Sequence, residues 1–181
     1  MPLAAAALAV LVLAAVPAAA DQNDPRLDTL FGDLQSADGP AALKVQNRIW
    51  EVWHQSGSDT VDLLMIDARE AMKHGQMEQA EAQYDAVVDL APEFAEGWNR
   101  RATLRFMQGD LTGSIEDINH VLDLEPRHFG AYSGLGMIYD RLGQPEAALK
   151  AFEAALGINP HMAQIRKRAG EIEKDLKDRE I

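Results

Sequence analysis

The sequence predicts an all-α fold built from helical hairpins that repeat every 34 residues. One observation is a set of prolines at this spacing, each preceded two residues earlier by an apolar residue: Pro92, Pro126 and Pro160. A second is a set of glycines at the same spacing: Gly75, Gly109 and Gly143. Glycine adopts positive φ readily and ends one helix before the next, whereas proline pushes the preceding residue out of the α region. Each unit therefore consists of a helix, a glycine turn, a second helix and a proline stop.

Residues 1–20 have the composition of a secretory signal peptide. They carry no charged side chain, and the apolar run from Leu3 to Val16 is followed by Pro17 and three alanines. Small residues at this place match an A-x-A cleavage site, so we expect export to the periplasm and a mature chain that starts at Asp21. The alternative is an uncleaved segment, because 20 helical residues reach about 30 Å, enough to span a bilayer. The protein would then be a membrane-anchored structural subunit of an envelope complex.

Residues 21–60 are predicted to form a helical hairpin. Its first helix has four apolar residues on one face and ends at Gly39-Pro40, and its second helix carries two tryptophans, Trp50 and Trp53. A shift of 34 residues aligns Trp50 with Tyr84 of the first full unit. We therefore interpret the pair as a degenerate repeat that caps the N-terminal end of the array. The four apolar residues of the first helix are Leu27, Leu30, Phe31 and Leu34.

Three full units follow, at residues 61–94, 95–128 and 129–162. Apolar residues recur in them at steps of three and four, as in amphipathic helices. In the third unit, Tyr132 and Tyr139 lie on the first helix and Phe152 on the second. We expect three aromatic residues to belong to the core: Trp98, Tyr132 and Phe152.

This pattern resembles the tetratricopeptide repeat (TPR), a 34-residue helix–turn–helix with the signature W-x2-L-G-x2-Y, A-x3-F and P. The segment YSGLGMIY at 132–139, the pair Ala148 and Phe152, and Pro160 match that signature. The resemblance implies a right-handed TPR solenoid. The first two units depart from the pattern at its Leu and Tyr positions, which predicts looser packing there: Asp67, Ala71, Arg101 and Arg105.

Residues 163–181 are predicted to form a charged helix that caps the last repeat. An apolar stripe runs along one side of it, and the remaining positions are densely charged. Such a helix covers the open end of a repeat array and keeps its outer face in water. The stripe consists of Met162, Ile165, Ala169, Ile172 and Leu176.

The composition argues against several classes of function. The net charge of −12 and the pI near 4.7 argue against nucleic acid, which is bound through clustered Lys and Arg. There is no cysteine, so there is no disulfide, thiolate metal site or thiol nucleophile. The five histidines are scattered and are interpreted as surface or turn residues, and no carboxylate pair suggests an acid and a base. We expect no catalytic residue, no metal site, no cofactor and no enzyme activity.

In the resembling family, the first helix of each repeat lines a concave groove that binds a protein or peptide. Several methionines fall on the groove positions here, and methionine suits surfaces that accept varied apolar partners. The alternative is that Met72, Phe106 and Met107 pack between repeats or contact the chain's own terminal helix. The resemblance implies the following groove residues: Met65, Arg69, Met72, Asn99, Thr103, Phe106, Met107, Ser133 and Met137.

Family members that hold the acidic C-terminal tails of heat-shock chaperones clamp a carboxylate with Lys, Asn and Arg. The residues at those positions here do not form that clamp: Met65 and Arg69 in the first unit, Asn99 and Thr103 in the second, and Gly130 and Gly134 in the third. We therefore expect an adaptor or scaffold that binds another envelope protein in its groove. The pattern sets neither the partner's identity nor the oligomeric state.

Overall fold

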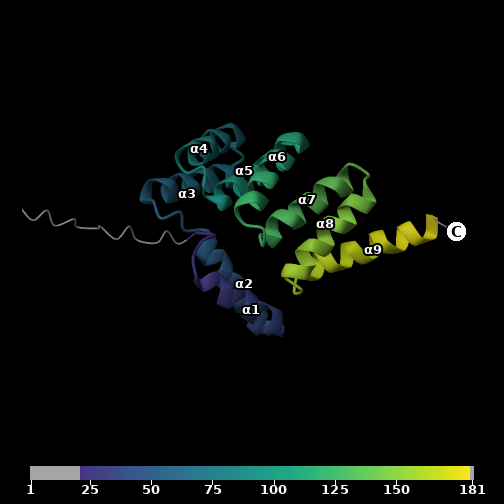
Figure 1. Cartoon of the computed structure of the whole chain (residues 1–181). Coiled ribbons are helices and arrows are strands. Elements are labelled where there is room, and N and C mark those ends of the chain that lie inside the picture. Colours follow the sequence, from purple (N-terminus) through teal and green to yellow (C-terminus); the bar gives the residue numbers. More distant parts are fainter. Residues whose placement is uncertain (1–20, 180–181) are drawn as a thin grey trace, which may run out of the picture.

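The computed structural model describes residues 21–179, and all regular structure within them is helical (Figure 1). The helices occur in chain order as α1 (Arg26–Ser36), α2 (Gly39–Trp53), α3 (Asp59–Lys73), α4 (Met77–Leu90), α5 (Ala95–Gln108), α6 (Leu111–Leu124), α7 (Phe129–Arg141), α8 (Pro145–Ile158) and α9 (Ala163–Arg179). Gly75, Gly109 and Gly143 have φ values of 73°, 87° and 68° and close the three turns within the repeated units. The all-α prediction is confirmed.

The pairs α3–α4, α5–α6 and α7–α8 are the most closely packed helices, and they follow one another as a solenoid (Figure 1). Small residues make this approach possible, because Ala68, Ala80 and Ala148 are fully buried. Phe152 is also buried, as predicted, and packs against Ile172 of α9. Trp98 and Tyr132 are only partly buried, so they lie at the edge of the core, where Trp98 packs against one of its clusters.

Trp98 is held near the surface by polar contacts that its indole ring makes. The indole N–H donates a hydrogen bond to the carbonyl of Pro92, and the ring stacks on His120 with 4.3 Å between centroids. The guanidinium carbon of Arg101 lies 4.8 Å from the centroid of the same ring. A tryptophan satisfies its polar edge in this way while its body covers apolar neighbours.

The two arginines that depart from the repeat pattern form ion pairs with one buried carboxylate. Asp117 of α6 is 1% exposed, and its oxygens lie 2.8 Å from Arg101 Nη2 and 3.0 Å from Arg105 Nη1. Arg101 also contacts Asp85 of α4 at 2.8 Å. This charge cluster joins the first and second repeated hairpins. Ion pairs thus replace the apolar contacts of the leucine and the tyrosine that the repeat pattern would place at Arg101 and Arg105.

The N-terminal hairpin α1–α2 forms as predicted, but its predicted place is wrong. Within the described residues, α2 and α3 are not among the helices that pack closely together. Figure 1 shows α1 and α2 beside the start of α7, away from the outer side of α3. Trp53 of α2 packs with Phe129 of α7, and their ring centroids are 5.2 Å apart. The hairpin therefore does not stack as a degenerate repeat.

The connection between α2 and α3 turns the chain away from the solenoid axis. Gly57 has a φ of 75°, a value that other residues adopt rarely. Ser56 donates hydrogen bonds from its N–H and its hydroxyl to the Asp62 carboxylate, at 2.9 and 2.7 Å. Ser58 caps the N-terminus of α3 by accepting from the Val61 N–H. These local bonds let α3 begin without support from α2.

The hairpin runs along the edge where the three proline corners line up. Gln22 donates to the Glu93 carbonyl of the first corner and accepts from the Ala95 N–H. Asp28 pairs with Arg127 of the second corner at 2.7 Å. At the third corner, the Asn159 amide donates to the Gln46 side chain at 2.7 Å. One hairpin thus braces three successive repeats.

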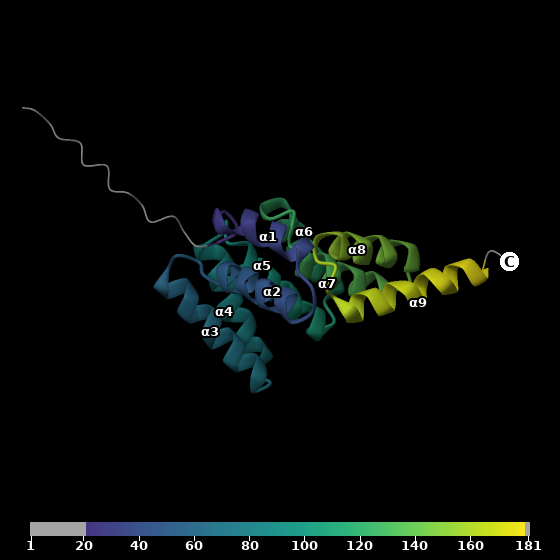
Figure 2. The ribbon, with the colours of Figure 1, turned by 90° about the horizontal axis from the view of Figure 1, so that it is seen from below.

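At the opposite end of the chain, α9 extends alongside α8 (Figure 2). Ala169 and Ile172 of the predicted apolar stripe are buried against α8, and Ile165 and Leu176 are partly buried there. Met162 packs instead on the cluster formed by the N-terminal hairpin. An ion pair between Arg168 and Asp140, at 2.7 Å, attaches α9 to α7.

We predict that replacement of Asp117 by alanine lowers the free energy of unfolding by about 3–5 kcal/mol, because it leaves Arg101 and Arg105 without their buried partner. Urea denaturation monitored by circular dichroism measures this change. The matched control is Asp85→Ala, since Asp85 is 50% exposed in its contact with the same arginine. That variant should lose less than about 1 kcal/mol. Equal losses for the two variants would contradict the assignment of Asp117 as the centre of the cluster.

Candidate functional site

A hollow on the concave side of the solenoid lies between α5 and α7. We call it the α5–α7 pocket, and its volume is about 280 Å³. Its floor is apolar and includes Ala102, Ile118 and Ile138, while Asn99 and Ser133 supply polar groups. Trp50 of the N-terminal hairpin also lines it. The pocket therefore combines residues of two repeats with one residue from outside the repeats.

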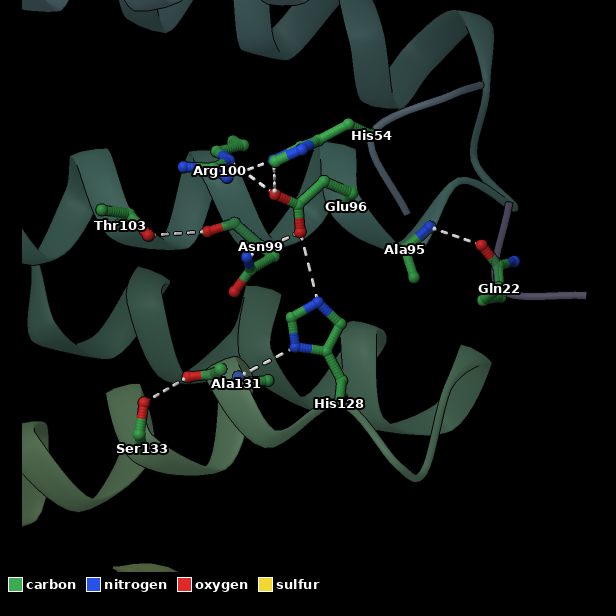
Figure 3. A network of polar contacts seen from close by, with 11 residues as sticks. Gln22, His54, Ala95, Glu96, Asn99, Arg100, Thr103, His128, Ala131 and Ser133 are labelled. Carbon is green, nitrogen blue, oxygen red and sulfur yellow. Dashed lines mark hydrogen bonds and ion pairs between the residues drawn. The ribbon is translucent and has the colours of Figure 1, made fainter. Parts of the chain in front are cut away.

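Next to this pocket, Glu96 of α5 forms the centre of a buried polar network (Figure 3). Its carboxylate is 1% exposed and accepts from Arg100 Nε at 2.6 Å and from the Asn99 amide at 2.8 Å. Nε2 of His128 lies 3.2 Å from one carboxylate oxygen, and Nε2 of His54 lies 3.2 Å from the other. These partners come from α5, from the α6–α7 corner and from the end of α2.

The hydrogen bonds of His128 define its tautomer. Its Nδ1 accepts from the Ala131 N–H at 3.0 Å, so Nδ1 carries no proton and the side chain caps the N-terminus of α7. Nε2 is then the nitrogen that donates to Glu96. A histidine interpreted from sequence as a surface or turn residue is thus fully buried at the start of a helix, with both ring nitrogens bonded.

The environment of Glu96 keeps its carboxyl group ionised. Burial alone would raise the pKa of Glu96, but the charge of Arg100 and the hydrogen bond from His128 outweigh burial, so the pKa lies well below its usual range. A buried carboxylate is tolerated only when it is paired and hydrogen-bonded. The junction between the hairpin and the second and third repeated units therefore forms around a permanent negative charge.

Aromatic rings continue this junction toward the pocket. Trp53 stacks on His128 with 4.2 Å between ring centroids and 9° between ring planes. Trp50 meets Phe129 edge to face at 5.3 Å, and the guanidinium of Arg100 lies 5.9 Å from the Trp50 ring centroid. A Cβ atom at Gly130 would come within 2.7 Å of the Trp50 ring. The tryptophan thus occupies the space that a side chain at Gly130 would need.

The structure separates the predicted groove residues into three groups. Asn99, Thr103, Phe106, Ser133 and Met137 line the α5–α7 pocket. Met65 and Arg69 line a second hollow together with His54 and Arg100. Met72 and Met107 line neither: Met72 is packed inward beneath the Tyr84 hydroxyl, at 3.6 Å, whereas Met107 is 55% exposed.

Met72 packs within its own repeated unit, against Tyr84 of α4, and Phe106 is partly buried against the neighbouring core. Sequence reasoning did not select Trp50, His54, Glu96 or His128 for the site. Only Glu96 had a sequence signal for membership of the site, namely its position on the groove side of α5. Trp50 and His54 reach the site through the docking of the hairpin, and His128 reaches it because its corner is buried.

Metal ligation and membrane insertion are two further possibilities for residues 21–179. No group of three or more His, Asp or Glu side chains in that range could hold a metal ion. Nor does any helix in that range combine the length and the apolarity that crossing a membrane requires. The predicted signal peptide at residues 1–20 lies outside the described residues.

Comparison with known proteins finds repeat proteins of one kind. Family models described as "Tetratricopeptide repeat" match residues 68–119 and residues 130–162. A TPR repeat-containing protein of Rhizobium etli is 43% identical over 136 residues, which cover 75% of this chain and 67% of that protein. Human tetratricopeptide repeat protein 36 is 28% identical over 76% of this chain and 75% of its own length.

Among solved structures, the fold is similar to the first TPR of Spaghetti (RPAP3) bound to the HSP90 peptide SRMEEVD. The TM-score is 0.63 at 22% identity, and the match covers 66% of this chain and 95% of the other. The likeness to this structure shows the fold, and it agrees with the solenoid of paired helices described above.

We predict that Glu96→Gln lowers the free energy of unfolding at pH 7 by about 1–3 kcal/mol, because hydrogen bonds to a charged group are lost. The folded-state pKa of Glu96 is depressed, so its contribution is complete above the unfolded pKa of about 4.3 and is lost as the pH falls below that value. Between about pH 4.5 and pH 3, stability should therefore fall more steeply with acidification in the wild type than in Glu96→Gln.

Urea titrations at several pH values measure both slopes. The control is Glu70→Gln, since Glu70 is an exposed carboxylate that pairs with Lys73 on the surface of α3. Parallel curves for the wild type and Glu96→Gln across this range would contradict a buried, ionised Glu96.

Proposed function

The chain belongs to the tetratricopeptide repeat family, and from this premise we propose that it is an adaptor or scaffold that binds one partner protein or peptide in its concave groove. The repeats of this family are protein-interaction modules. In this role the protein binds its partner without catalysing a reaction, and the partner is in the cell envelope.

The α5–α7 pocket is the observation that carries this proposal. An interaction surface is anchored by a few residues that fill pockets, with polar groups around them. Here Ile118 and Ile138 form an apolar floor, Asn99 and Ser133 contribute polar atoms, and Met137 stands at the rim with 43% of its surface exposed. A flexible methionine beside such a pocket can adjust to the group that enters it.

The groove favours an apolar anchor over the acidic chaperone tail held by the similar Spaghetti domain. A carboxylate clamp needs several convergent positive charges, but Arg100 is already paired with Glu96 and Arg69 does not line the α5–α7 pocket. At the positions that would supply further cations, the third repeated unit has Gly130 and Gly134. Trp50 fills the space beside Gly130 with an aromatic ring. These features support a partner that inserts a side chain into the pocket.

The proposed envelope location rests on residues 1–20, whose apolar run and terminal alanines are typical of a signal peptide. The second candidate function, a structural subunit held in the membrane by this segment, rests on the same residues. In the first case the described solenoid is free in the periplasm, and in the second it is attached to the membrane.

We predict that Met137→Asp abolishes capture of the partner by crosslinking in intact envelopes, because a carboxylate that is buried unpaired against an apolar ligand is costly. Its melting temperature should stay close to that of the wild type, since exposed positions change stability by less than about 0.5 kcal/mol. Met107→Asp is the matched control, because Met107 is exposed on α5 but does not line the pocket. Equal capture by the two variants would place the partner elsewhere.

N-terminal sequencing of the protein recovered from the envelope tests the proposed location. The expected first residue is Asp21, because the small residues Ala18 to Ala20 precede it. A start at Met1 in a membrane fraction that resists salt washing would overturn the cleaved form and favour the anchored subunit.

A further inference from the structure

The α5–α7 pocket has the size of a site for one side chain. Its volume of about 280 Å³ lies below the range of roughly 300–1,000 Å³ that is typical of pockets for small-molecule ligands. Trp50, Phe106 and Met137 line it together with the apolar floor residues. Aromatic rings and methionine sulfur both make favourable contacts with an aromatic group.

The pocket exists because α7 carries glycine where a side chain would fill it. A Cβ atom at Gly134 would meet only Ile118 Cδ1, at 3.5 Å, which is an ordinary van der Waals contact. The neighbouring space at Gly130 is already occupied by Trp50. The N-terminal hairpin therefore closes one side of the pocket, and the glycine at 134 leaves the other side open.

The two hydroxyl groups that line the pocket have their hydrogens engaged. Thr103 donates its hydroxyl hydrogen to the Asn99 carbonyl and Ser133 donates to the Gly130 carbonyl, each at 2.9 Å. The Asn99 amide nitrogen donates to Glu96, which directs the amide oxygen away from that carboxylate (Figure 3).

In the part of the chain that the structure describes, no donor is bonded to Asn99 Oδ1, Thr103 Oγ1 or Ser133 Oγ. Figure 3 shows these three residues on the same side of the contact between Glu96 and His128. The pocket thus presents three hydrogen-bond acceptors to an incoming group that carries a donor.

We propose that the α5–α7 pocket binds one tyrosine or tryptophan side chain of the partner, with its ring beside Trp50, Phe106 and Met137 and its O–H or N–H donated to one of the acceptors on Asn99, Thr103 and Ser133. The inference rests on the proposed function and specifies the chemistry of the partner. Tyrosine and tryptophan combine an apolar ring with one polar hydrogen, the combination that these walls complement. They are also enriched among the residues that dominate binding energy at interfaces.

The test uses a phage-displayed library of random twelve-residue peptides, selected on the purified chain. The enriched peptides should share a tyrosine or tryptophan, and its replacement by alanine should weaken binding by at least about tenfold, as for an anchor residue. Gly134→Leu should produce a similar loss because it fills the pocket. This variant should remain folded, because leucine is a far better helix former than glycine.

The matched control is Gly170→Leu, at a glycine of α9 whose Cβ position has nothing within 4 Å. It should bind the selected peptides as the wild type does. Replacement of the anchor by phenylalanine should also weaken binding, because phenylalanine supplies no donor.

The outcomes distinguish this inference from the proposed function. Peptides that bind the wild type and Gly134→Leu equally, or that share an aliphatic anchor in place of an aromatic one, overturn the pocket assignment but leave groove binding in place. If phenylalanine binds as well as tyrosine or tryptophan, the role of the acceptors is overturned. If no peptide is enriched on the wild-type chain, the proposed function falls together with the inference.

Discussion

The arrangement of this protein depends on the need to neutralise one buried carboxylate. Glu96 is almost completely removed from solvent, and an ion in such a place is tolerated only when charges and donors surround it. Arg100 and Asn99 come from its own helix and His128 from the corner between α6 and α7, while His54 of the N-terminal hairpin contacts both Arg100 and the carboxylate. The relative positions of three parts of the chain are therefore coupled to one side chain.

This coupling changes what the repeat array presents to a partner. The hairpin α1–α2 lies along the three proline corners instead of extending the solenoid by one unit, and it brings Trp50 to the edge of the concave side. The α5–α7 pocket consequently has a wall that no repeat supplies. A corner that recurs every 34 residues offers contacts at regular intervals, which is why one hairpin can brace several repeats.

The local features of the fold could be predicted from the sequence, because they depend on short-range chemistry. Glycine and proline spacing located the turns, and the apolar steps identified the buried faces of α1 and α9. The position of the hairpin could not be predicted in this way. It depends on pairs such as Gln46 and Asn159, which lie 113 residues apart. The 34-residue shift that aligned this hairpin with the first repeat compares only the spacing of apolar residues. That spacing is the same whether the amphipathic hairpin packs on α3 or on the proline corners.

Some predicted groove residues line the pocket and others do not, because some positions follow from helix geometry and others from long-range packing. Asn99, Thr103, Phe106, Ser133 and Met137 line the pocket as the repeat register implies, since their places follow from helix geometry. Met72 turns inward because Tyr84 and the adjacent core accept it. Trp50 joins the pocket only through the long-range docking of the hairpin, and no feature within its own helix indicates this.

A double-mutant cycle on Trp53→Ala and Phe129→Ala tests the docking of the hairpin most directly, because these rings are in contact only if α2 lies against α7. Unfolding free energies of the two single variants and the double variant should reveal a coupling energy of about 0.5–3 kcal/mol. The comparison cycle pairs Trp53→Ala with Val61→Ala, at the start of α3, and it should be additive within about 0.5 kcal/mol. Coupling to Val61 together with additivity at Phe129 would mean that the hairpin stacks on the first repeat, and would contradict the account.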